Sequence, residues 1–356
     1  MTHQAAFIKE RHANLVVEHV ETPSPGDDEI LVKVEVIAFS PIEYKLQRYI
    51  VSRPQISPDT KIQPRFELHK ISYPHALGLT FSGIVHAVGP NVISLKVGDN
   101  IAGARGIAQL NDNRFGAYQQ FALVKEKLCS KLLPRTTLED AAAAILNLAT
   151  ISSALTLHLG LDRPSLSGTP STKGEKVLIY GGSSMCGGLA IKFAVAAGYT
   201  VVTTSSPRNL DFVESLGADH IIDHTAAPKT IQDELVHHGP YKAILDTIGS
   251  PPTSGVIMPY LASIGGGVYN ALTPLIGDAP GNVQCRFASY GWDIENEEHP
   301  NFRRWFFEEL LPKGLESGLV TPIRTQEIEG GLGNAQKALD MMANGAVSGR
   351  KLIMYP

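Results

Sequence analysis

The sequence predicts an α/β protein in which a doubly wound parallel sheet accompanies a smaller, β-rich domain. Two observations lead to this prediction. The 356 residues exceed the usual size of one domain. The hydrophobic pattern also changes, from strand-like in the first third of the chain to a regular strand–helix alternation beyond residue 175. Such alternation indicates βαβ units, and therefore a parallel sheet with helices on both faces.

The first 135 residues read as short strands separated by turns. Residues 31–36, 83–88 and 118–123 alternate apolar and polar side chains, as half-buried strands do. Five glycines and a proline supply the bends between such runs: Gly78, Gly83, Gly89, Pro90, Gly98 and Gly103. We therefore expect residues 1–135 to form a folded-over antiparallel sheet or partial barrel.

The remainder of the chain carries the βαβ pattern. A helix is predicted over 139–160, and residues 162–174 form a connector rich in Pro, Ser and Gly. Strands are then predicted at 177–180, 200–203, 221–222, 243–246 and 267–269, with helices between them. We predict one domain over 136–319. The segment from about 320 to 356, with a final strand at 351–354, is expected to return to the first domain.

Composition excludes several classes of partner. The formal net charge is −4, from 31 basic and 35 acidic residues, and no basic run interleaved with aromatic residues suggests a nucleic-acid surface. Residues 1–6 do not resemble a secretory signal. The most apolar run, 141–151, is interrupted by Asn147 and is shorter than the roughly 18 residues of a membrane span. We therefore expect a cytoplasmic protein that binds neither nucleic acid nor membrane.

A glycine-rich turn is the strongest functional motif. The apolar strand 177–180 leads into Gly181 and then into a helical run. A strand, a turn of small residues and a helix together direct backbone N–H groups at a pyrophosphate. Ser184 occupies the middle glycine of the G-x-G-x-x-G spacing, where its hydroxyl could bind phosphate. The residues predicted to contact the nucleotide are Gly182, Ser183, Ser184, Met185 and Cys186.

The end of the second strand favours NADPH over NADH. NAD-binding proteins carry an acidic residue at about this point, which holds the ribose 2′-hydroxyl. This chain instead reads Thr203-Thr204-Ser205-Ser206-Pro207-Arg208. Hydroxyls and a guanidinium suit a 2′-phosphate, which a carboxylate would repel. The alternative is an ordinary Ser-Pro helix start followed by a solvated arginine. The predicted contacts are Ser205, Ser206, Pro207 and Arg208.

Several further segments resemble the medium-chain dehydrogenase/reductase superfamily, and within it the zinc-independent fungal branch of trans-acting enoyl reductases and quinone oxidoreductase-like proteins. Residues 40–47, Ser-Pro-Ile-Glu-Tyr-Lys-Leu-Gln, are similar to an Asn-Pro-x-Asp-x-Lys segment beside the nicotinamide, with Ser40 and Glu43 as substitutions. Other matching segments are 78–85, 97–99, 115–119 and 347–351. The resemblance covers nearly the whole chain. It implies a GroES-like domain, a Rossmann domain and NADPH in the cleft between them.

The same resemblance assigns roles to individual residues. It implies that Ser40, Pro41, Ile42 and Glu43 lie beside the nicotinamide, and that Ile248 and Gly249 flank its ribose. It places Val347 and Ser348 on the cofactor, and His224 where relatives carry a tyrosine near the adenosine ribose. The segment that would line the substrate channel is Tyr269, Asn270, Ala271 and Leu272.

No zinc ligands are expected. Gly78-Leu79-Thr80 stands where the zinc branch has Gly-His-Glu, and residues 90–128 contain no cysteine for a structural zinc site. Without a Lewis acid, reduction of an already activated double bond is favoured. We predict hydride transfer to an α,β-unsaturated carbonyl. The candidate proton donors are Tyr44, Lys45 and, more distantly, Tyr49. Lys45 could instead hold the cofactor ribose or pair with Glu43, and the proton could come from solvent.

The substrate is poorly encoded, and alternatives stay open. Residues 50–76 could be a lid or a static loop. The stretch 270–299, with Phe287, Tyr290 and Trp292, could wall a pocket or mediate dimerisation. The favoured substrate is an enoyl or enone compound, either a small molecule or one carried by a polyketide synthase as candidate partner. The alternatives are a quinone or carbonyl reductase and a non-catalytic NADPH-binding protein. A monomer and a homodimer are equally compatible with the sequence.

Overall fold

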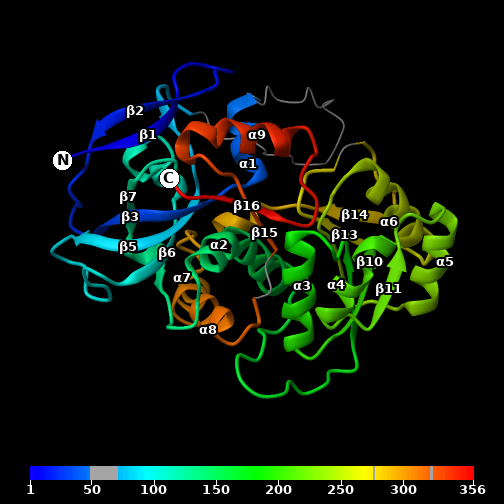
Figure 1. The fold of residues 1–356 in the computed structure, drawn as a ribbon. Helices are drawn as coiled ribbons and strands as arrows, with labels where there is room; N and C mark the ends of the chain where they lie inside the picture. Colours follow the sequence, from blue (N-terminus) through cyan, green and yellow to red (C-terminus); the bar gives the residue numbers. More distant parts are fainter. Residues whose placement is uncertain (49–70, 276, 321–323) are drawn as a thin grey trace. The chain divides into compact units, whose positions relative to one another are not determined.

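The computed structural model describes residues 1–48, 71–275, 277–320 and 324–356. The chain divides into two compact units. Unit 1 comprises residues 1–146 and 294–356, and unit 2 comprises residues 147–293. Figure 1 shows strands from both ends of the sequence within unit 1, the blue and cyan strands beside β16 in red.

Unit 1 contains two sheets. Their strands are β1 (Thr2–Ile8), β2 (Leu15–Glu21), β3 (Glu29–Ala38), β4 (His75–Ala76), β5 (Thr80–Val88), β6 (Asn100–Ala104), β7 (Phe121–Lys125), β8 (Cys129–Lys131), β15 (Thr325–Glu327) and β16 (Lys351–Met354). The smaller sheet has the order β2-β1-β4. The larger has the order β15-β16-β3-β5-β6-β8, with β7 also paired to β3. Every pair except β15–β16 is antiparallel, as predicted for this β-rich domain.

The last strand returns to the first domain. β16 pairs antiparallel with β3, which brings Ile353 opposite Ala38. The N–H of Phe39 also donates to the carbonyl of Leu352 at 3.0 Å. These bonds place Ser40, the residue after Phe39, beside the start of β16. Ser40 is part of the candidate site described below.

The predicted domain boundary at 319 differs from the structure, because residues 294–319 belong to unit 1. This segment forms α7 (Pro300–Trp305), the π-helical turn η7 (Phe306–Leu310) and α8 (Leu311–Glu316). Its large apolar side chains, including Phe302, Trp305 and Phe306, are buried. Glu295 accepts the N–H of Ile107 at 2.7 Å, so polar contacts also hold the segment within unit 1.

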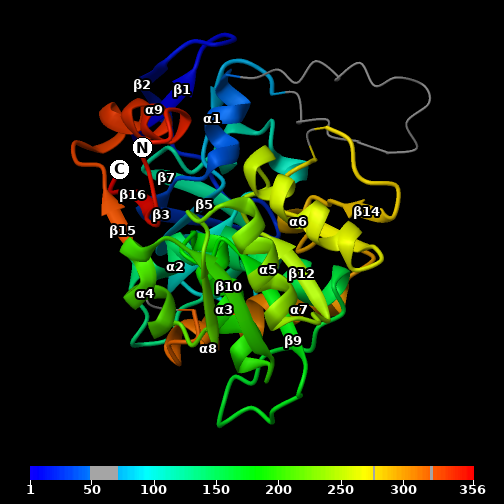
Figure 2. The ribbon, with the colours of Figure 1, turned by 90° about the vertical axis from the view of Figure 1, so that its right-hand side faces the viewer.

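Two further helices of unit 1 pack together beside the β-sheets. α1 (Pro41–Arg48) follows β3, and α9 (Ala335–Ala343) precedes β16. Gln47 donates to Gln336 at 2.7 Å, and Arg48 pairs with Asp340. Both views show the two helices side by side (Figures 1 and 2). α1 was not predicted as a helix, because its eight residues give too little periodicity.

Unit 2 is a parallel six-stranded sheet in the order β11-β10-β9-β12-β13-β14. Its strands are β9 (Lys176–Tyr180), β10 (Thr200–Ser205), β11 (His220–Asp223), β12 (Ala243–Asp246), β13 (Gly267–Ala271) and β14 (Val283–Arg286). Its helices are α3 (Met185–Ala196), α4 (Leu210–Ser215), α5 (Pro228–His238) and α6 (Pro251–Ser263). Figure 2 shows α5 and α6 with β12 and β14. The doubly wound sheet is confirmed; β14 was missed because it is only four residues long.

One helical stretch is longer than the predicted apolar run. α2 (Leu138–Ser153) continues as a π-helical turn, Ala154–His158. Over Leu138–His158 the chain has the length and apolar character that could cross a membrane, but 67% of its most apolar window is buried inside the fold. Core helices of soluble proteins have the same properties, so this stretch is weak evidence for a membrane span.

Candidate active site

The glycine-rich turn joins β9 to α3, and Ser184 caps the helix. Ser184 has extended backbone angles (φ −71°, ψ 161°), and its Oγ accepts the N–H of Gly187 at 2.9 Å. The same hydroxyl bonds Thr247 Oγ1 at 2.9 Å. The helix therefore begins at Met185. Ser184 stabilises the helix start, a different role from the predicted hydrogen bond to phosphate.

Close packing in this turn requires glycine. Gly181 has φ +88°, in the left-handed region. A Cβ on Gly187 would lie 2.1 Å from the carbonyl oxygen of Gly181, and one on Gly182 would lie 2.3 Å from Thr203 Oγ1. The next four residues, Ser183 to Cys186, are partly exposed. Their backbone lies at the positive end of the helix dipole, so this turn fits a dinucleotide pyrophosphate.

The residues predicted to select the cofactor lie together after β10. Ser205 and Ser206 are buried, whereas Pro207 and Arg208 are exposed. His224, also exposed, donates its backbone N–H to the carbonyl of Ser205 at 3.1 Å. Hydroxyl, guanidinium and imidazole groups thus occur at one edge of the sheet. This group of residues fits the adenosine end of the cofactor.

The turn after β12 is organised by Asp246, which the sequence analysis did not single out. Its buried carboxylate accepts the N–H groups of Ile248 and Gly249, both at 2.9 Å, and the hydroxyl of Thr253 at 2.6 Å. Ile248 remains 42% exposed, and a Cβ on Gly181 would lie 2.6 Å from its Cγ1. Ile248 and Gly249 are therefore held beside the glycine-rich turn. The signal in the sequence was an acidic residue at the end of an apolar strand.

The predicted substrate segment lies mostly inside unit 2. Tyr269 and Ala271 are each 2% exposed and belong to its hydrophobic core. Asn270, also 2% exposed, donates to the carbonyl of Ile244 at 3.2 Å. Only Leu272 is partly exposed. Alternation along β13 turns Tyr269 and Ala271 to the same buried face.

In unit 1, Glu43 serves as a buried acceptor. It is fully buried, and its carboxylate accepts three hydrogen bonds: from the N–H of Ser40 at 2.7 Å, the N–H of Leu79 at 2.9 Å and the hydroxyl of Tyr118 at 2.9 Å. Burial raises the pKa of Glu43, although these hydrogen bonds oppose the shift. The predicted contact between Glu43 and a cofactor is therefore replaced by an internal role: Glu43 fixes the start of α1.

Ser40 is joined to a lysine that the predicted site did not include. Lys351, the first residue of β16, is 4% exposed, and its Nζ donates to Ser40 Oγ at 2.8 Å. The two residues are 311 positions apart, so no local pattern could reveal their contact. The other predicted residues near β16, Val347 and Ser348, lie in the preceding connection, half-buried and exposed respectively.

The remaining residues of α1 are more accessible. Pro41 is exposed, and Ile42 and Tyr44 are half-buried. Lys45 is also half-buried, and burial lowers its pKa. Within the described chain it makes no hydrogen bond or ion pair, including with Glu43. Tyr49 and most of the proposed lid, residues 49–70, lie outside the described residues.

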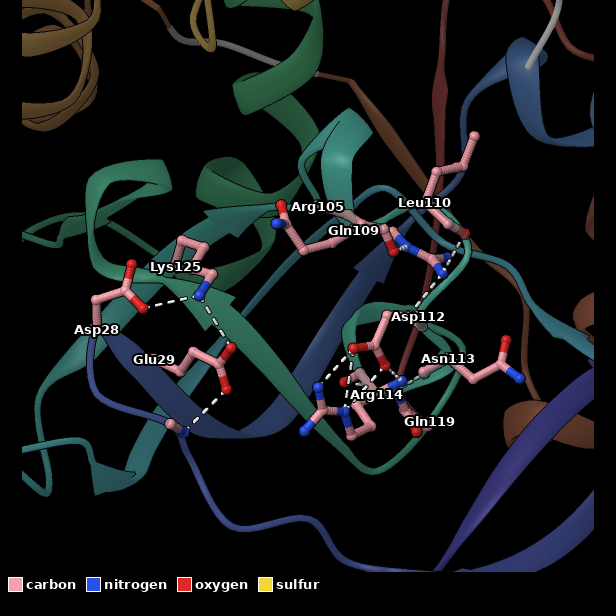
Figure 3. A network of polar contacts seen from close by, with 11 residues as sticks. Asp28, Glu29, Arg105, Gln109, Leu110, Asp112, Asn113, Arg114, Gln119 and Lys125 are labelled. Atoms are coloured by element: carbon pink, nitrogen blue, oxygen red, sulfur yellow. Dashed lines mark hydrogen bonds and ion pairs between the residues drawn. The ribbon is translucent and has the colours of Figure 1, made fainter. Parts of the chain in front are cut away.

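A buried arginine holds the segment that leads to Tyr118. Arg105 is 2% exposed and donates to the carbonyls of Ala76 at 2.6 Å, Leu110 at 2.7 Å and Asp112 at 2.9 Å. Asp112 in turn binds Arg114 through its side chain at 2.6 Å. Figure 3 shows Arg105, Asp112 and Arg114 in this network. It fixes residues 105–114 and thereby supports the turn that carries Tyr118 to Glu43.

The aromatic residues of the stretch 270–299 pack within unit 2. Tyr290 is 3% exposed, and its ring meets Phe287 at 6.1 Å and His158 at 4.8 Å between centroids. Trp292 is half-buried and ends the 3₁₀ turn Tyr290–Trp292. Over residues 1–48, 71–275, 277–320 and 324–356, no group of three or more His, Cys, Asp or Glu side chains is arranged to hold a metal ion.

Two family models match the chain. Residues 26–135 match the alcohol dehydrogenase GroES-like domain, and residues 186–273 match the zinc-binding dehydrogenase domain. The matches fall on the β-rich sheets of unit 1 and, in unit 2, on α3 and the strands that follow it.

Curated relatives match over the whole length. The trans-enoyl reductase himH of Aspergillus japonicus is 33% identical over 99% of this chain and 97% of its own. The dehydrogenase azaJ of Aspergillus niger is 30% identical over 99% of both chains. The trans-enoyl reductase FSL5 of Gibberella zeae is 28% identical over 99% of this chain and 97% of its own.

Solved structures share the fold. A quinone oxidoreductase from Pseudomonas syringae superposes with a TM-score of 0.72 at 22% identity, over 99% of this chain and 100% of its own. A mycobacterial protein complexed with NADPH gives a TM-score of 0.72 at 21% identity, again over 99% and 100%. With the glycine-rich turn and both matched domains, these similarities show that the chain is an oxidoreductase of the medium-chain dehydrogenase/reductase superfamily.

Proposed function

We propose that this protein is an NADPH-dependent, zinc-independent reductase of an activated C=C bond in an enoyl or enone substrate. The observation that carries the cofactor assignment is the sheet edge of unit 2, where the glycine-rich turn after β9 adjoins Ser205, Ser206 and Arg208 at the end of β10. The relatives named trans-enoyl reductase support the substrate class. The quinone oxidoreductase fold supports a quinone or carbonyl reductase as the second candidate.

The preference for NADPH rests on charge. Positions 203–209 contain hydroxyl side chains and one guanidinium but no carboxylate. Arg208 is exposed and its guanidinium can pair with a 2′-phosphate, whereas NADH offers it no such partner. Charge-assisted hydrogen bonds of this kind are among the stronger ones in proteins.

The reaction needs little from the protein beyond positioning and polarisation. Bound NADPH would supply a hydride to the β-carbon of the substrate, leaving NADP⁺. Electrons of the double bond then move to the carbonyl oxygen, and the α-carbon takes a proton. Lys45 is the candidate side chain for that proton or for the cofactor ribose, because it is half-buried and makes no hydrogen bond or ion pair within the described chain.

The biological setting we propose is cytoplasmic, with the substrate free or carried by a polyketide synthase. The supporting observation is that curated relatives matching over their full length bear the name trans-enoyl reductase. Co-purification with a synthase tests the partner, and NADPH binding without turnover of any substrate would indicate a non-catalytic protein.

The deciding experiment is NADPH oxidation followed by absorbance against α,β-unsaturated thioesters, enones and quinones, with and without a chelator. We expect turnover of the enoyl set that survives chelation and that is faster with NADPH than with NADH. Turnover confined to quinones would favour the second candidate. Loss of activity with chelator would overturn the zinc-independent assignment.

A further inference from the structure

Ser40 carries a buried hydroxyl whose proton has no acceptor within the described chain. The residue is 2% exposed and immediately precedes α1. Its Oγ accepts a hydrogen bond from Lys351 Nζ at 2.8 Å. An ammonium group can only donate, so this bond uses a lone pair of Ser40 and leaves its O–H proton unused. A buried donor without an acceptor is unfavourable, and such a group is expected to meet its acceptor in a ligand.

Three hydrogen bonds hold this hydroxyl in position, and the first is the bond from Lys351 described above. The N–H of Ser40 donates to Glu43 at 2.7 Å, and Glu43 is itself held by Leu79 and Tyr118. The N–H of Phe39, which precedes Ser40, donates to the carbonyl oxygen of Leu352, which follows Lys351, at 3.0 Å. Ser40 and Lys351 are therefore held in position by the fold itself, and such preorganisation is the condition for effective electrostatic stabilisation.

Lys351 also changes the chemistry of the hydroxyl. A positive charge 2.8 Å from Oγ, on a lysine only 4% exposed, draws electron density from the O–H bond and makes it a stronger donor. Such polarisation contributes most when the acceptor gains negative charge during the reaction. The oxygen that gains charge in enoyl reduction is the substrate carbonyl, which becomes an enolate.

We propose that Ser40 is a catalytic residue that donates its O–H hydrogen bond to the carbonyl oxygen of the unsaturated substrate, with Lys351 as the residue that polarises it. This inference rests on the proposed function. Hydride from NADPH would add to the β-carbon, the resulting enolate would carry its charge on the carbonyl oxygen, and the α-carbon would take a proton from Lys45 or from solvent. Ser40 keeps its own proton and stabilises the developing oxyanion.

The test compares kcat with the dissociation constant of NADPH in four variants. We expect Ser40→Ala to lower kcat for an enoyl thioester by about 100-fold, as removal of one oxyanion donor does, with NADPH affinity within about twofold of wild type. Lys351→Met should lower kcat, and Ser40→Ala/Lys351→Met should be no slower than Ser40→Ala alone, because both changes remove one interaction. Ser40→Thr, which keeps the hydroxyl, should recover most of the rate.

Ser82→Ala provides the matched control. Ser82 is also a buried serine of unit 1, and its hydroxyl donates to the carbonyl of Leu138 at 2.6 Å. Its replacement should lower the unfolding temperature and leave kcat unchanged. Thermal unfolding of every variant separates loss of folding from loss of chemistry.

Each outcome decides between the two proposals. If the wild-type protein does not reduce enoyl thioesters, the proposed function fails and this inference fails with it. If the wild type reduces them but Ser40→Ala keeps its kcat, only this inference is overturned. If Ser40→Ala weakens NADPH binding and spares kcat, Ser40 contacts the cofactor instead of the substrate carbonyl, which also overturns the inference.

Discussion

The hydroxyl of Tyr269 on β13 donates a 2.7 Å hydrogen bond to Oδ2 of Asp246 at the end of β12. Tyr269 is buried, and burial together with the nearby carboxylate raises its pKa well above the ordinary value. Asp246 also holds the backbone of Ile248 and Gly249. The core of unit 2 is therefore connected directly to the turn proposed to flank the nicotinamide ribose.

Replacement of Asp246 by Ala should damage both stability and cofactor binding. The change leaves several donors inside unit 2 without their acceptor, so we expect a loss of on the order of 3 kcal/mol in unfolding free energy. Urea denaturation measures this loss, and NADPH titration should show weaker binding. Tyr269→Phe is the milder comparison, at about 1 kcal/mol. Equal stability of Asp246→Ala and wild type would contradict this role.

Gly187→Ala should weaken NADPH binding by at least about tenfold, because the turn and the helix start must separate or distort. The added Cβ would lie 2.1 Å from the carbonyl oxygen of Gly181. Gly188→Ala is the matched control, since the nearest atom to its Cβ would be the end of the Leu216 side chain, at 3.2 Å, and the next would lie at 3.7 Å. Fluorescence titration with NADPH measures both. Similar affinities for the two variants would argue against pyrophosphate binding at this turn.

Arg208→Ala should reduce the preference for NADPH over NADH by roughly 10- to 100-fold, the value of a charge-assisted hydrogen bond to phosphate. The effect should appear in the ratio of kcat/KM for the two cofactors, with the NADH value nearly unchanged. Ser206→Asp should shift the ratio in the same direction, because a carboxylate repels the 2′-phosphate. An unchanged ratio in both variants would identify Arg208 as a solvated surface residue.

Lys45→Met should lower turnover, while Lys45→Arg should retain more of it if a cation is needed for positioning alone. Burial lowers the pKa of Lys45 below its ordinary value of 10.5. If protonated Lys45 is required, activity should therefore decline with rising pH below 10.5, and this decline should be absent in Lys45→Arg, which stays protonated. A pH–rate profile of each variant is the measurement. Full activity of Lys45→Met would leave solvent as the proton source.

His75 should make the protein sensitive to acid. The residue is fully buried, and burial lowers its pKa from 6.5 to about 3. The unfolded chain therefore binds a proton more readily than the folded one. The stability contributed by neutral His75 is complete above pH 6.5 and is lost as pH falls toward 3, by about 1.4 kcal/mol per pH unit.

Urea denaturation at pH 7 and pH 5 tests this expectation. The wild type should lose about 2 kcal/mol from His75 between the two values. His75→Leu should show a smaller dependence on pH over this range, whatever its stability at pH 7. The same slope in variant and wild type would mean that another group controls acid unfolding.

Local patterns were sufficient for most of the fold. The strands and helices of unit 2 appear in the sequence as segments with the hydrophobic periods that the structure shows. The glycine-rich turn is also visible locally, because the apolar strand β9, the small residues 181–184 and the start of α3 follow one another directly. Short elements were harder. α1 and β14 have eight and four residues, too few for a period to stand out from chance.

The sequence also did not predict which side chains face the core and which face solvent. Tyr269 lies in β13 and Leu272 directly follows it, but Tyr269 packs in the core and Leu272 is partly exposed. Which face of a strand is covered depends on the helices that pack against it, and these come from other parts of the chain. Residues 294–319 were likewise predicted to continue the nucleotide-binding domain, but they belong to unit 1.

By itself, the sequence determined the fold class and the cofactor-binding turn, because both depend on contacts between near neighbours whose residue types signal them. Only the tertiary structure decided what surrounds Ser40. Its hydroxyl bonds Lys351 across 311 positions, and Glu43, which accepts its N–H, is held by Tyr118 across 75 positions. Such contacts arise when β3 and β16 pair and the chain closes on itself, and no periodic pattern of residues encodes them.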